Sequence, residues 1–202
     1  MKPKLIICDV GGVLCGNTDV APAIATFLHL TVEEFYAVMG AGNWQALQSG
    51  ALSERAFWAQ FSHDFGRSVP DDLWDVLFDP SFDEGVAALL RELRRRFRVV
   101  AGTNTFASHY KTIERRGWYE AFNAIYASHT MGVAKPDSAF YWHILREEGR
   151  EPSEAFFIDD AEENVAAARA IELESHLYRD AASLRLDLEE RGLIRQGDAH
   201  RH

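Results

Sequence analysis

Short apolar runs, separated by longer segments of helical periodicity, dominate the hydrophobic pattern of the chain. The first run covers residues 4–8 and stops at the glycine turn of residues 9–12, as a buried strand does at its end. Four further apolar runs follow much later, at residues 97–101, 124–127, 155–158 and 175–178. Helical patterns lie around them, at residues 83–95, 107–116, 138–148, 162–171 and 181–190. Strands that alternate with helices predict an α/β fold, with helices on both faces of a parallel sheet.

Residues 17–81 interrupt this alternation, because they contain helix signals but no good strand pattern. Thr31 begins a capping-box sequence, Ser53 opens a second helix, and Pro70 stands where a third helix would start. Aromatic residues recur at helical spacing within the second of these segments. We therefore expect an α/β core of residues 1–16 and 82–202, and an all-helical module of residues 17–81 inserted after the first strand.

Composition narrows the class of protein. The chain has 202 residues, 47% of them apolar, which suffices for one core and a smaller satellite. A formal net charge of −10 disfavours nucleic acid and anionic membranes as partners. No stretch approaches the roughly 20 apolar residues of a membrane span. Two cysteines, Cys8 and Cys15, are too few for a disulfide framework, so we expect reduced thiols and a cytoplasmic location.

Chemically capable side chains follow the predicted strands. Ligands of open α/β sheets bind beyond the carboxyl ends of the strands. The residues at those ends carry carboxylate, hydroxyl, amide and ammonium groups: Asp9, Thr103, Asn104, Lys135, Asp159 and Asp160. Each has an ordinary structural interpretation when taken alone, such as a capped turn or a solvated lysine. Their occurrence at four successive strand ends favours a common site.

These residues lie in segments that resemble the four motifs of the haloacid dehalogenase-like (HAD) hydrolases, in the order of that family. The segments are Asp9–Leu14, Thr103–Thr105, Lys135–Pro136 and Phe157–Asp160 together with Asn164. The resemblance runs from about residue 4 to 178 and implies a Rossmann-like fold, with the helical module as the C1 cap of subfamily IA. Within the family, the chain is most similar to the subgroup of bacterial α-D-glucose-1-phosphate phosphatase and the phosphatase domain of soluble epoxide hydrolase.

The resemblance implies a Mg²⁺-dependent phosphatase acting on a small phosphorylated metabolite. Asp9 would be the nucleophile that forms an aspartyl-phosphate. Mg²⁺ would be held by the Asp9 carboxylate, the Gly11 carbonyl and the Asp160 carboxylate, with Asp159 at the edge of the site. By the same likeness, Asn164 would orient the metal loop.

The remaining motif residues would bind the phosphate. Thr103 is expected to donate a hydrogen bond to a phosphoryl oxygen, and Lys135 to neutralise phosphate and nucleophile. Asn104 is expected to contact the substrate. His109, five residues further on, also matches a pattern of the glucose-1-phosphate phosphatase branch.

Gly11 departs from the family pattern. Most family phosphatases carry a second aspartate there, which protonates the leaving group and then activates water. Such acid–base help is worth about 10²–10⁴-fold. Three interpretations stay open: a substrate with a good leaving group, such as a sugar 1-phosphate or acyl phosphate; another proton donor, with His109 as the candidate; or a weakened site.

Residues 43–50 of the helical module are candidates for choosing the substrate. Trp44 and Gln48 combine aromatic and amide character, which suits a sugar through stacking and hydrogen bonding. Trp44 is equally compatible with a purely structural place in the core of the module. A phosphorylated sugar is therefore an expectation rather than a consequence of the motifs.

Two alternatives belong to other functional classes. A 2-haloacid dehalogenase would keep Asp9 as nucleophile, but needs no metal and typically lacks the Asp159-Asp160 pair. A catalytically weak HAD-like binding or regulatory protein would have no reason to keep Asp9, Thr103, Lys135 and Asp160 together. The sequence favours the phosphatase and is compatible with a monomer or a homodimer.

Overall fold

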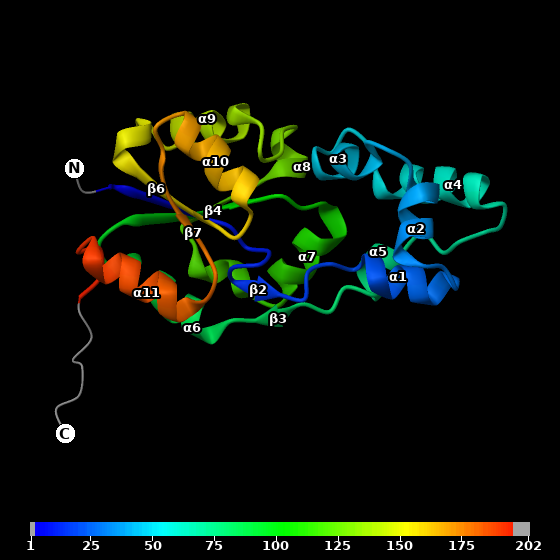
Figure 1. Ribbon diagram of the computed structural model, residues 1–202, viewed down its shortest axis with the longest axis horizontal. Helices are drawn as coiled ribbons and strands as arrows, with labels where there is room; N and C mark the ends of the chain where they lie inside the picture. Colours follow the sequence, from blue (N-terminus) through cyan, green and yellow to red (C-terminus); the bar gives the residue numbers. More distant parts are fainter. Residues whose placement is uncertain (1–2, 196–202) are drawn as a thin grey trace, which may run out of the picture.

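The computed structural model describes residues 3–195 and contains a five-stranded parallel sheet (Figure 1). The central strand is β1 (Leu5–Cys8), with β4 (Arg98–Thr103) on one side and β6 (Ala155–Asp159) on the other. Strands β5 (Ala124–Ala127) and β7 (Glu174–Leu177) form the edges, in the order β5-β4-β1-β6-β7. The predicted α/β fold with a parallel sheet is confirmed.

Helices cover both faces of this sheet, which explains why the central strands are apolar on both sides. Ile6 and Cys8 point into a core with the helices of one face: α6 (Glu84–Leu93), α7 (Ala107–Arg115) and α11 (Ala181–Glu190). Leu5 and Ile7 point to the helices of the opposite face: α9 (Ser138–Glu147) and α10 (Glu162–Ala170). All four residues of β1 are completely buried. Such a strand reads as a continuous apolar run rather than as an alternating one.

Short elements complete the core. A two-residue antiparallel pair joins β2 (Cys15–Gly16) to β3 (Ser81–Phe82), and the sequence pattern did not predict it. Three single-turn helices lie in connecting segments: η1 (Trp118–Ala121), α8 (Ser128–Met131) and η2 (Pro152–Glu154). The β2–β3 pair brings the two ends of residues 17–81 together. This segment, called the insert below, therefore leaves and re-enters the core at one place.

Five helices make up the insert between β2 and β3. They are α1 (Ala21–Leu28), α2 (Val32–Met39), α3 (Asn43–Gln48), α4 (Glu54–Phe65) and α5 (Leu73–Val76). The Thr31 capping box is present, because the Thr31 side chain accepts from the Glu34 amide at 3.1 Å and Glu34 accepts from the Thr31 amide at 2.8 Å. Ser53 caps α4 through the amide of Ala56 at 3.2 Å.

The predicted start of the third helix is wrong. Asp71 and Asp72 form a turn, and α5 begins only at Leu73 and lasts four residues. Asp72 precedes it without a side-chain capping hydrogen bond, so the sequence Pro-Asp-Asp lacks the contact that would start a helix there. The short helix is held by its buried side chains, Leu73 and Trp74, in the apolar core of the insert.

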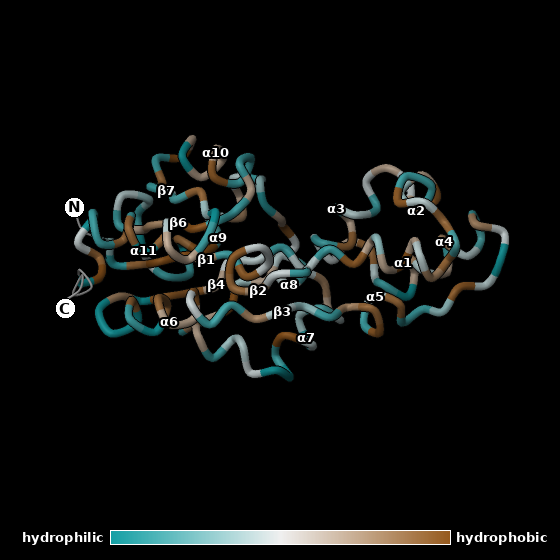
Figure 2. The backbone as a smooth tube through the Cα atoms, turned by 60° about the horizontal axis from the view of Figure 1, so that its bottom comes forward, coloured by the Kyte–Doolittle hydropathy of each residue, from teal (hydrophilic) through white to brown (hydrophobic). Residues whose placement is uncertain are grey.

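Hydrophobic side chains form one cluster on each face of the sheet and a third cluster in the insert; hydrophobic positions occur along the tube in both parts (Figure 2). The insert lies beyond the carboxyl ends of the strands (Figure 1). It is tied to α7 of the core at both ends of that helix: Glu54 accepts from the Ser108 amide at 2.8 Å, and Asp75 accepts from the Thr112 hydroxyl at 2.9 Å. Among residues 3–195, no helix is long and apolar enough to cross a membrane.

Glu172 occupies a position that favours glycine. It follows α10 with a φ of 63°, which is left-handed, and its side chain is exposed. This conformation costs a non-glycine residue about 1–2 kcal/mol. Part of that cost is offset because glycine loses more entropy on folding. Glu172→Gly should therefore raise the free energy of unfolding by about 0.5–1 kcal/mol in urea denaturation. Glu172→Ala keeps the strained φ and serves as control, and an equal gain in both variants would contradict this explanation.

Candidate active site

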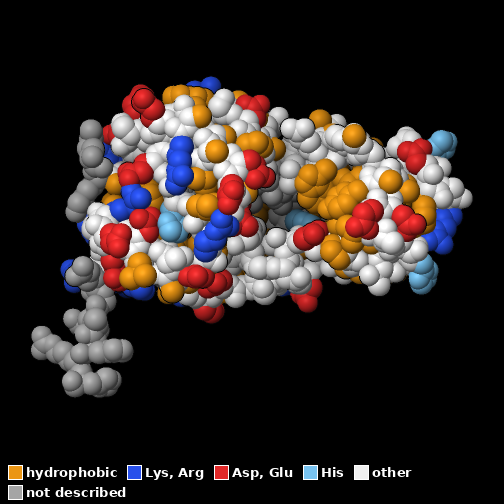
Figure 3. Space-filling view, viewed as in Figure 1, with side chains coloured by type: hydrophobic (Ala, Val, Ile, Leu, Met, Phe, Trp, Pro, Cys, Tyr) orange, Lys and Arg blue, Asp and Glu red, His pale blue; other side chains and the backbone are white. Residues whose placement is uncertain are grey.

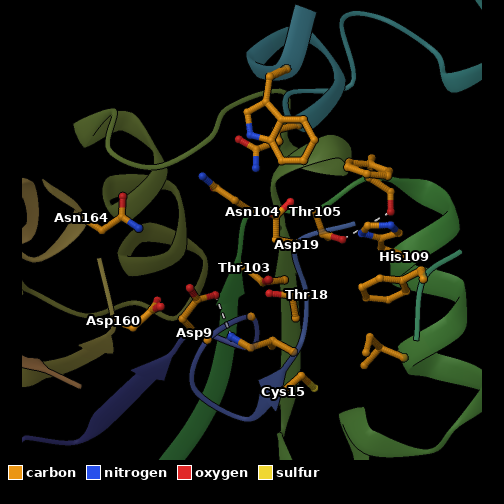
Figure 4. Close-up of a pocket in the computed structure, with 18 of the residues that line it drawn as sticks. Asp9, Cys15, Thr18, Asp19, Thr103, Asn104, Thr105, His109, Asp160 and Asn164 are labelled. Carbon is orange, nitrogen blue, oxygen red and sulfur yellow. Dashed lines mark hydrogen bonds between the residues drawn. The ribbon is translucent and has the colours of Figure 1, made fainter. Parts of the chain in front are cut away.

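The side chains predicted to form a site do converge at the carboxyl edge of the sheet (Figure 4). Asp9 follows the central strand β1, Thr103 ends β4, and Asp159 ends β6 with Asp160 directly after it. Because β1 lies between β4 and β6, these strand ends are neighbours. Lys135 reaches the same place from the loop before α9, as its contacts show.

Lys135 is the centre of the site. Its ammonium lies 2.9 Å from Asp9 Oδ2, 2.7 Å from Asp159 Oδ2 and 3.0 Å from the Gly102 carbonyl oxygen. These three acceptors match the three hydrogens of an ammonium group. Burial on its own lowers the pKa of Lys135, but the attraction of the two carboxylates outweighs it and raises the pKa above its usual value. Lys135 is therefore a fixed positive charge beneath the pocket.

Asp159 is fully buried and already has partners on both oxygens. Its Oδ2 accepts from Lys135, and its Oδ1 accepts from the Ala161 amide at 2.9 Å and from Asn164 Nδ2 at 3.0 Å. The main contact of Asp159 is thus with Lys135. Asn164 contacts Asp159 and is held in turn by Tyr141, whose hydroxyl donates to the Asn164 carbonyl at 2.8 Å.

Asp9, Asp159 and Asp160 form a carboxylate cluster that could hold a metal ion. One oxygen from each lies within 4.8 Å of the others. Carboxylate oxygens are hard ligands of the kind that Mg²⁺ prefers. Asp160 is the most accessible of the three and has no other partner among the contacts described above. Since Asp159 is engaged, Asp9 and Asp160 are the carboxylates best able to bind an ion.

Burial, and after it the crowding of carboxylates, raises the pKa of two of them. Burial, followed by the charge of Asp159, raises the pKa of Asp9, while Lys135 and the hydrogen bond from the Val10 amide act in the opposite direction. Burial and Asp159 likewise raise the pKa of Asp160. A cation at this place would favour the ionised form of both groups.

The two glycines after Asp9 have different environments. Gly12 has a φ of 77°, and a Cβ there would overlap the Asp160 carboxylate. Both the backbone conformation and the lack of space therefore exclude a side chain. Gly11 does not have a positive φ, and a Cβ there would meet Thr18 Oγ1 first, at 3.6 Å. The backbone therefore requires glycine at position 12 but not at position 11. Sequence reasoning missed the role of Gly12, although the Gly-Gly pair was visible.

Asn104 orients Lys135 instead of facing the pocket with a free amide group. Its Nδ2 donates to the Lys135 carbonyl at 2.9 Å, and its Oδ1 accepts from the Lys135 amide at 2.8 Å. This reciprocal pair fixes the backbone of the residue that carries the buried ammonium. Asn104 also lines the pocket, but its side chain mainly positions Lys135.

His109 is a neutral ring in the wall of the pocket. Its Nε2 lies 3.0 Å from the Trp74 carbonyl oxygen, and since a carbonyl only accepts, Nε2 carries the hydrogen. The ring stacks on Phe78, with the centroids 3.6 Å apart. Burial lowers the pKa of His109 to about 4. The other nitrogen therefore has no proton to give at neutral pH, which argues against His109 as the substitute acid.

A pocket of about 370 Å³ opens above the carboxylate cluster, between core and insert. Trp44 and Gln48 of α3 line it, as predicted from their side chains. Trp44 also packs on Trp74 and Phe106, with centroid distances of 5.9 and 5.8 Å, so its structural and pocket-lining places coincide. Thr18 and Asp19 line the pocket as well, and no motif in the sequence singled them out.

Sheet, insert and strand-end site together define a hydrolase of the HAD type, and comparison with known proteins agrees. The chain belongs to the haloacid dehalogenase-like hydrolase family, whose model matches residues 3–172. The predicted membership of this family is thereby confirmed. The catalytic roles of individual residues are a separate question.

One curated relative is named a phosphatase, and another is named a flavin mononucleotide hydrolase. The sesquiterpene phosphatase astK of Aspergillus oryzae is 27% identical over 175 residues, which are 83% of this chain and 86% of that protein. The flavin mononucleotide hydrolase 1 of Arabidopsis thaliana is 32% identical over 115 residues, 56% of this chain but only 46% of that protein.

Solved structures agree on the fold. The HAD family enzyme bt-2542 of Bacteroides thetaiotaomicron, in a magnesium complex, superposes with a TM-score of 0.77. The match covers 92% of this chain and 99% of the other, at 22% identity. At this identity the likeness concerns the fold.

The two glycines generate a matched pair of substitutions. Gly12→Ala should lower the free energy of unfolding by at least about 1–2 kcal/mol, because of its left-handed φ, and should displace Asp160. Gly11→Ala should stay within about 0.5 kcal/mol of wild type, since its Cβ would make only an ordinary van der Waals contact with Thr18. Urea denaturation of the two variants measures the difference. Equal losses in stability in the two variants would contradict the different requirements for glycine assigned to positions 11 and 12.

Proposed function

We propose that the chain is a Mg²⁺-dependent phosphatase that hydrolyses a small phosphorylated metabolite through an aspartyl-phosphate. The observation that carries the proposal is the position of Asp9: at the end of the central strand, 2.9 Å from a buried ammonium and within one cluster with Asp160. The names of two relatives, a sesquiterpene phosphatase and a flavin mononucleotide hydrolase, support the reaction class. The insert would act as the cap that closes over the substrate.

Asp9 attacks phosphorus through a carboxylate oxygen, and the bond from phosphorus to the ester oxygen breaks. Water then attacks the aspartyl-phosphate, releasing inorganic phosphate and restoring the carboxylate. Phosphoryl transfer passes through a loose transition state, so catalysis depends mainly on positioning and charge. A carboxylate at the end of a fixed strand is well placed for this step.

Mg²⁺ would be held by the carboxylates of Asp9 and Asp160 and by the Gly11 carbonyl. When bound, it offsets the repulsion between the anionic nucleophile and the anionic phosphate. The hard oxygen donors and the two raised carboxylate pKa values fit such a cation. Asp159 contributes indirectly, by holding Lys135.

Lys135 supplies permanent positive charge below the nucleophile. Its three acceptors leave it no spare hydrogen, so it acts on the phosphoryl group through its charge and through its hold on Asp9. The Thr103 hydroxyl, at the end of β4, would donate to a phosphoryl oxygen. Asn104 keeps Lys135 in place.

The site has no evident side chain to protonate the leaving group at the two positions considered, 11 and 109. Position 11 is glycine, and His109 holds its one proton against a backbone carbonyl. We infer that the physiological substrate has a leaving group that departs without strong acid assistance. The sugar 1-phosphate suggested by the glucose-1-phosphate phosphatase likeness is one such ester, and a phosphate on an acidic hydroxyl is another. The enzyme would work in the cytoplasm as a monomer or homodimer.

The alternatives predict different dependence on metal. A 2-haloacid dehalogenase needs no cation, so it would not need the Asp160 carboxylate next to Gly12 as a metal ligand. A binding protein with a weakened site would not turn over any ester. Mg²⁺-dependent hydrolysis of p-nitrophenyl phosphate, whose leaving group needs little acid help, distinguishes the phosphatase from both.

Asp9→Asn should reduce that hydrolysis by at least about 10³-fold, because an amide is not a competent nucleophile. Thermal unfolding of the variant should show an intact fold. Asp160→Ala serves as comparison: activity should fall but recover partly at high Mg²⁺. A variant Asp9→Asn that keeps a tenth of wild-type activity would exclude the covalent route.

Mg²⁺ affinity should weaken as the pH falls. The raised pKa values mean that Asp9 and Asp160 bind protons at higher pH than ordinary aspartates do, and the cation must displace them. From pH 7.5 to 5.5 the apparent affinity should drop roughly tenfold or more. Isothermal titration in two buffers of different ionisation enthalpy should also detect the released protons. Constant affinity across this range would place the cation elsewhere.

Gly11→Asp tests the missing acid directly. Gly11 has no positive φ, and a Cβ there would only contact Thr18, so the backbone tolerates an aspartate at this position. In wild type, rates should depend steeply on leaving-group acidity, and Gly11→Asp should flatten that dependence by raising alkyl-phosphate rates about 10-fold or more. Gly11→Asn fills the same space without an acid and is the control. If wild type already hydrolyses alkyl and aryl esters at equal chemical rates, the glycine is no deficit.

A further inference from the structure

The pocket has two chemically different ends. In Figure 4, Asp9, Asp160 and Asn164 lie on one side and His109 on the other, with Thr18 and Asp19 between them. The side around His109 is formed by rings and an aliphatic side chain. We call it the apolar wall; it consists of Phe78, Phe106, His109, Ile113 and Tyr119.

The apolar wall is closely packed and uncharged. His109 stacks on Phe78 at 3.6 Å and lies 4.2 Å from the Phe106 ring, centroid to centroid. Its Nε2 hydrogen is directed to the Trp74 carbonyl and away from a ligand. Ile113, one turn later on the same helix, is buried. A ring of a ligand could bury its faces against this wall.

Cations are absent from the described residues that line the pocket. None of these residues is a lysine or arginine, whereas three are aspartates: Asp9, Asp160 and Asp19. Lys135 lies beneath the cluster with its three acceptors in place. A cation at the cluster could compensate one phosphate. A second anionic group on the substrate would therefore meet negative potential near Asp19 without a partner.

The apolar wall offers a ligand few hydrogen-bonding groups: Phe78, Phe106 and Ile113 carry none, and Tyr119 carries one hydroxyl. His109 donates to Trp74, and the Thr105 hydroxyl lies 3.4 Å from the Phe106 carbonyl. A sugar ring placed there would bury several hydroxyl groups with few partners, and each such loss costs binding free energy. Gln48 and Asp19 could serve one side of a sugar but not the face on the wall.

The entrance is apolar as well. Tyr36 lines the pocket from α2 and remains 44% exposed. Figure 3 shows hydrophobic side chains gathered on the insert, on the face that borders the hollow between insert and core. An apolar ligand would keep favourable contacts while it enters.

We propose that the substrate is a phosphate monoester of an uncharged, ring-bearing, apolar alcohol or phenol, with its ring on the apolar wall. The proposal rests on the phosphatase function and names the substrate class for that site. The phenolic esters of this class also fit Gly11, because a phenolic leaving group departs without a general acid. The products are inorganic phosphate and the free alcohol.

Substrate pairs matched in leaving-group type test the proposal. Benzyl phosphate and glucose 6-phosphate are both esters of primary alcohols, so they differ mainly in the polarity of the ring. The kcat/KM of wild type should be at least about tenfold higher for benzyl phosphate, since burying an apolar ring is worth that much. A higher kcat/KM for the sugar ester, or equality of the two, would overturn the proposal.

A second pair tests the charge argument. Phenyl phosphate should exceed 4-carboxyphenyl phosphate in kcat/KM by roughly threefold or more. Asp19→Asn keeps an oxygen that can accept from the Ala21 amide, as Asp19 does at 3.0 Å, but removes the charge. This variant should narrow the phenyl-to-carboxyphenyl ratio while benzyl phosphate stays preferred over the sugar ester. An unchanged ratio would refute the role assigned to Asp19.

Different results would refute the phosphatase function and the apolar substrate class. Without Mg²⁺-dependent turnover of p-nitrophenyl phosphate, or with full activity in Asp9→Asn, the phosphatase function itself is wrong. With that turnover present and lost in Asp9→Asn, a preference for the sugar ester refutes only the apolar substrate class.

Discussion

The buried ammonium of Lys135, held between Asp9 and Asp159, is the interaction on which the rest of the site depends. Without it, two carboxylates would face each other at the end of a sheet with no compensating charge, which is a costly arrangement. With it, the nucleophile, β6 and the loop before α9 are fixed relative to one another. Asn104 and Asn164 extend this network by holding Lys135 and Asp159, respectively. One cation thereby organises three strand ends.

Much of this arrangement could be predicted from the sequence, because it follows from strand ends. A parallel sheet brings its carboxyl ends to one edge, so residues 9, 103 and 159 had to meet if their strands were neighbours, whereas Lys135 reaches them from a loop. What each side chain does after meeting could not be predicted. Whether Asn104 faces a ligand or Lys135 depends on a loop that has no regular pattern, and the same holds for the short α5 and for the β2–β3 pair.

His109 illustrates the same limit from another side. Its type and spacing suggested a proton donor, since histidine titrates near neutral pH. Its environment reverses that expectation, because burial against Phe78 favours the neutral ring and the Trp74 carbonyl takes its hydrogen. A titratable residue is defined by its surroundings as much as by its chemistry. In this pocket the histidine resembles a small aromatic residue more than an acid.

Glu54 gives α7 a particular mechanical property. The helix begins after Phe106, which provides no side-chain cap, and Glu54 of the insert accepts the amide hydrogen of Ser108 in its first turn. A helix whose start is completed by another part of the chain is stable only while both parts remain docked. If the insert swings outward, the first turn of α7 loses its anion and frays, and His109 lies within that turn. The same outward motion of the insert would then admit a ligand and loosen the wall that receives it.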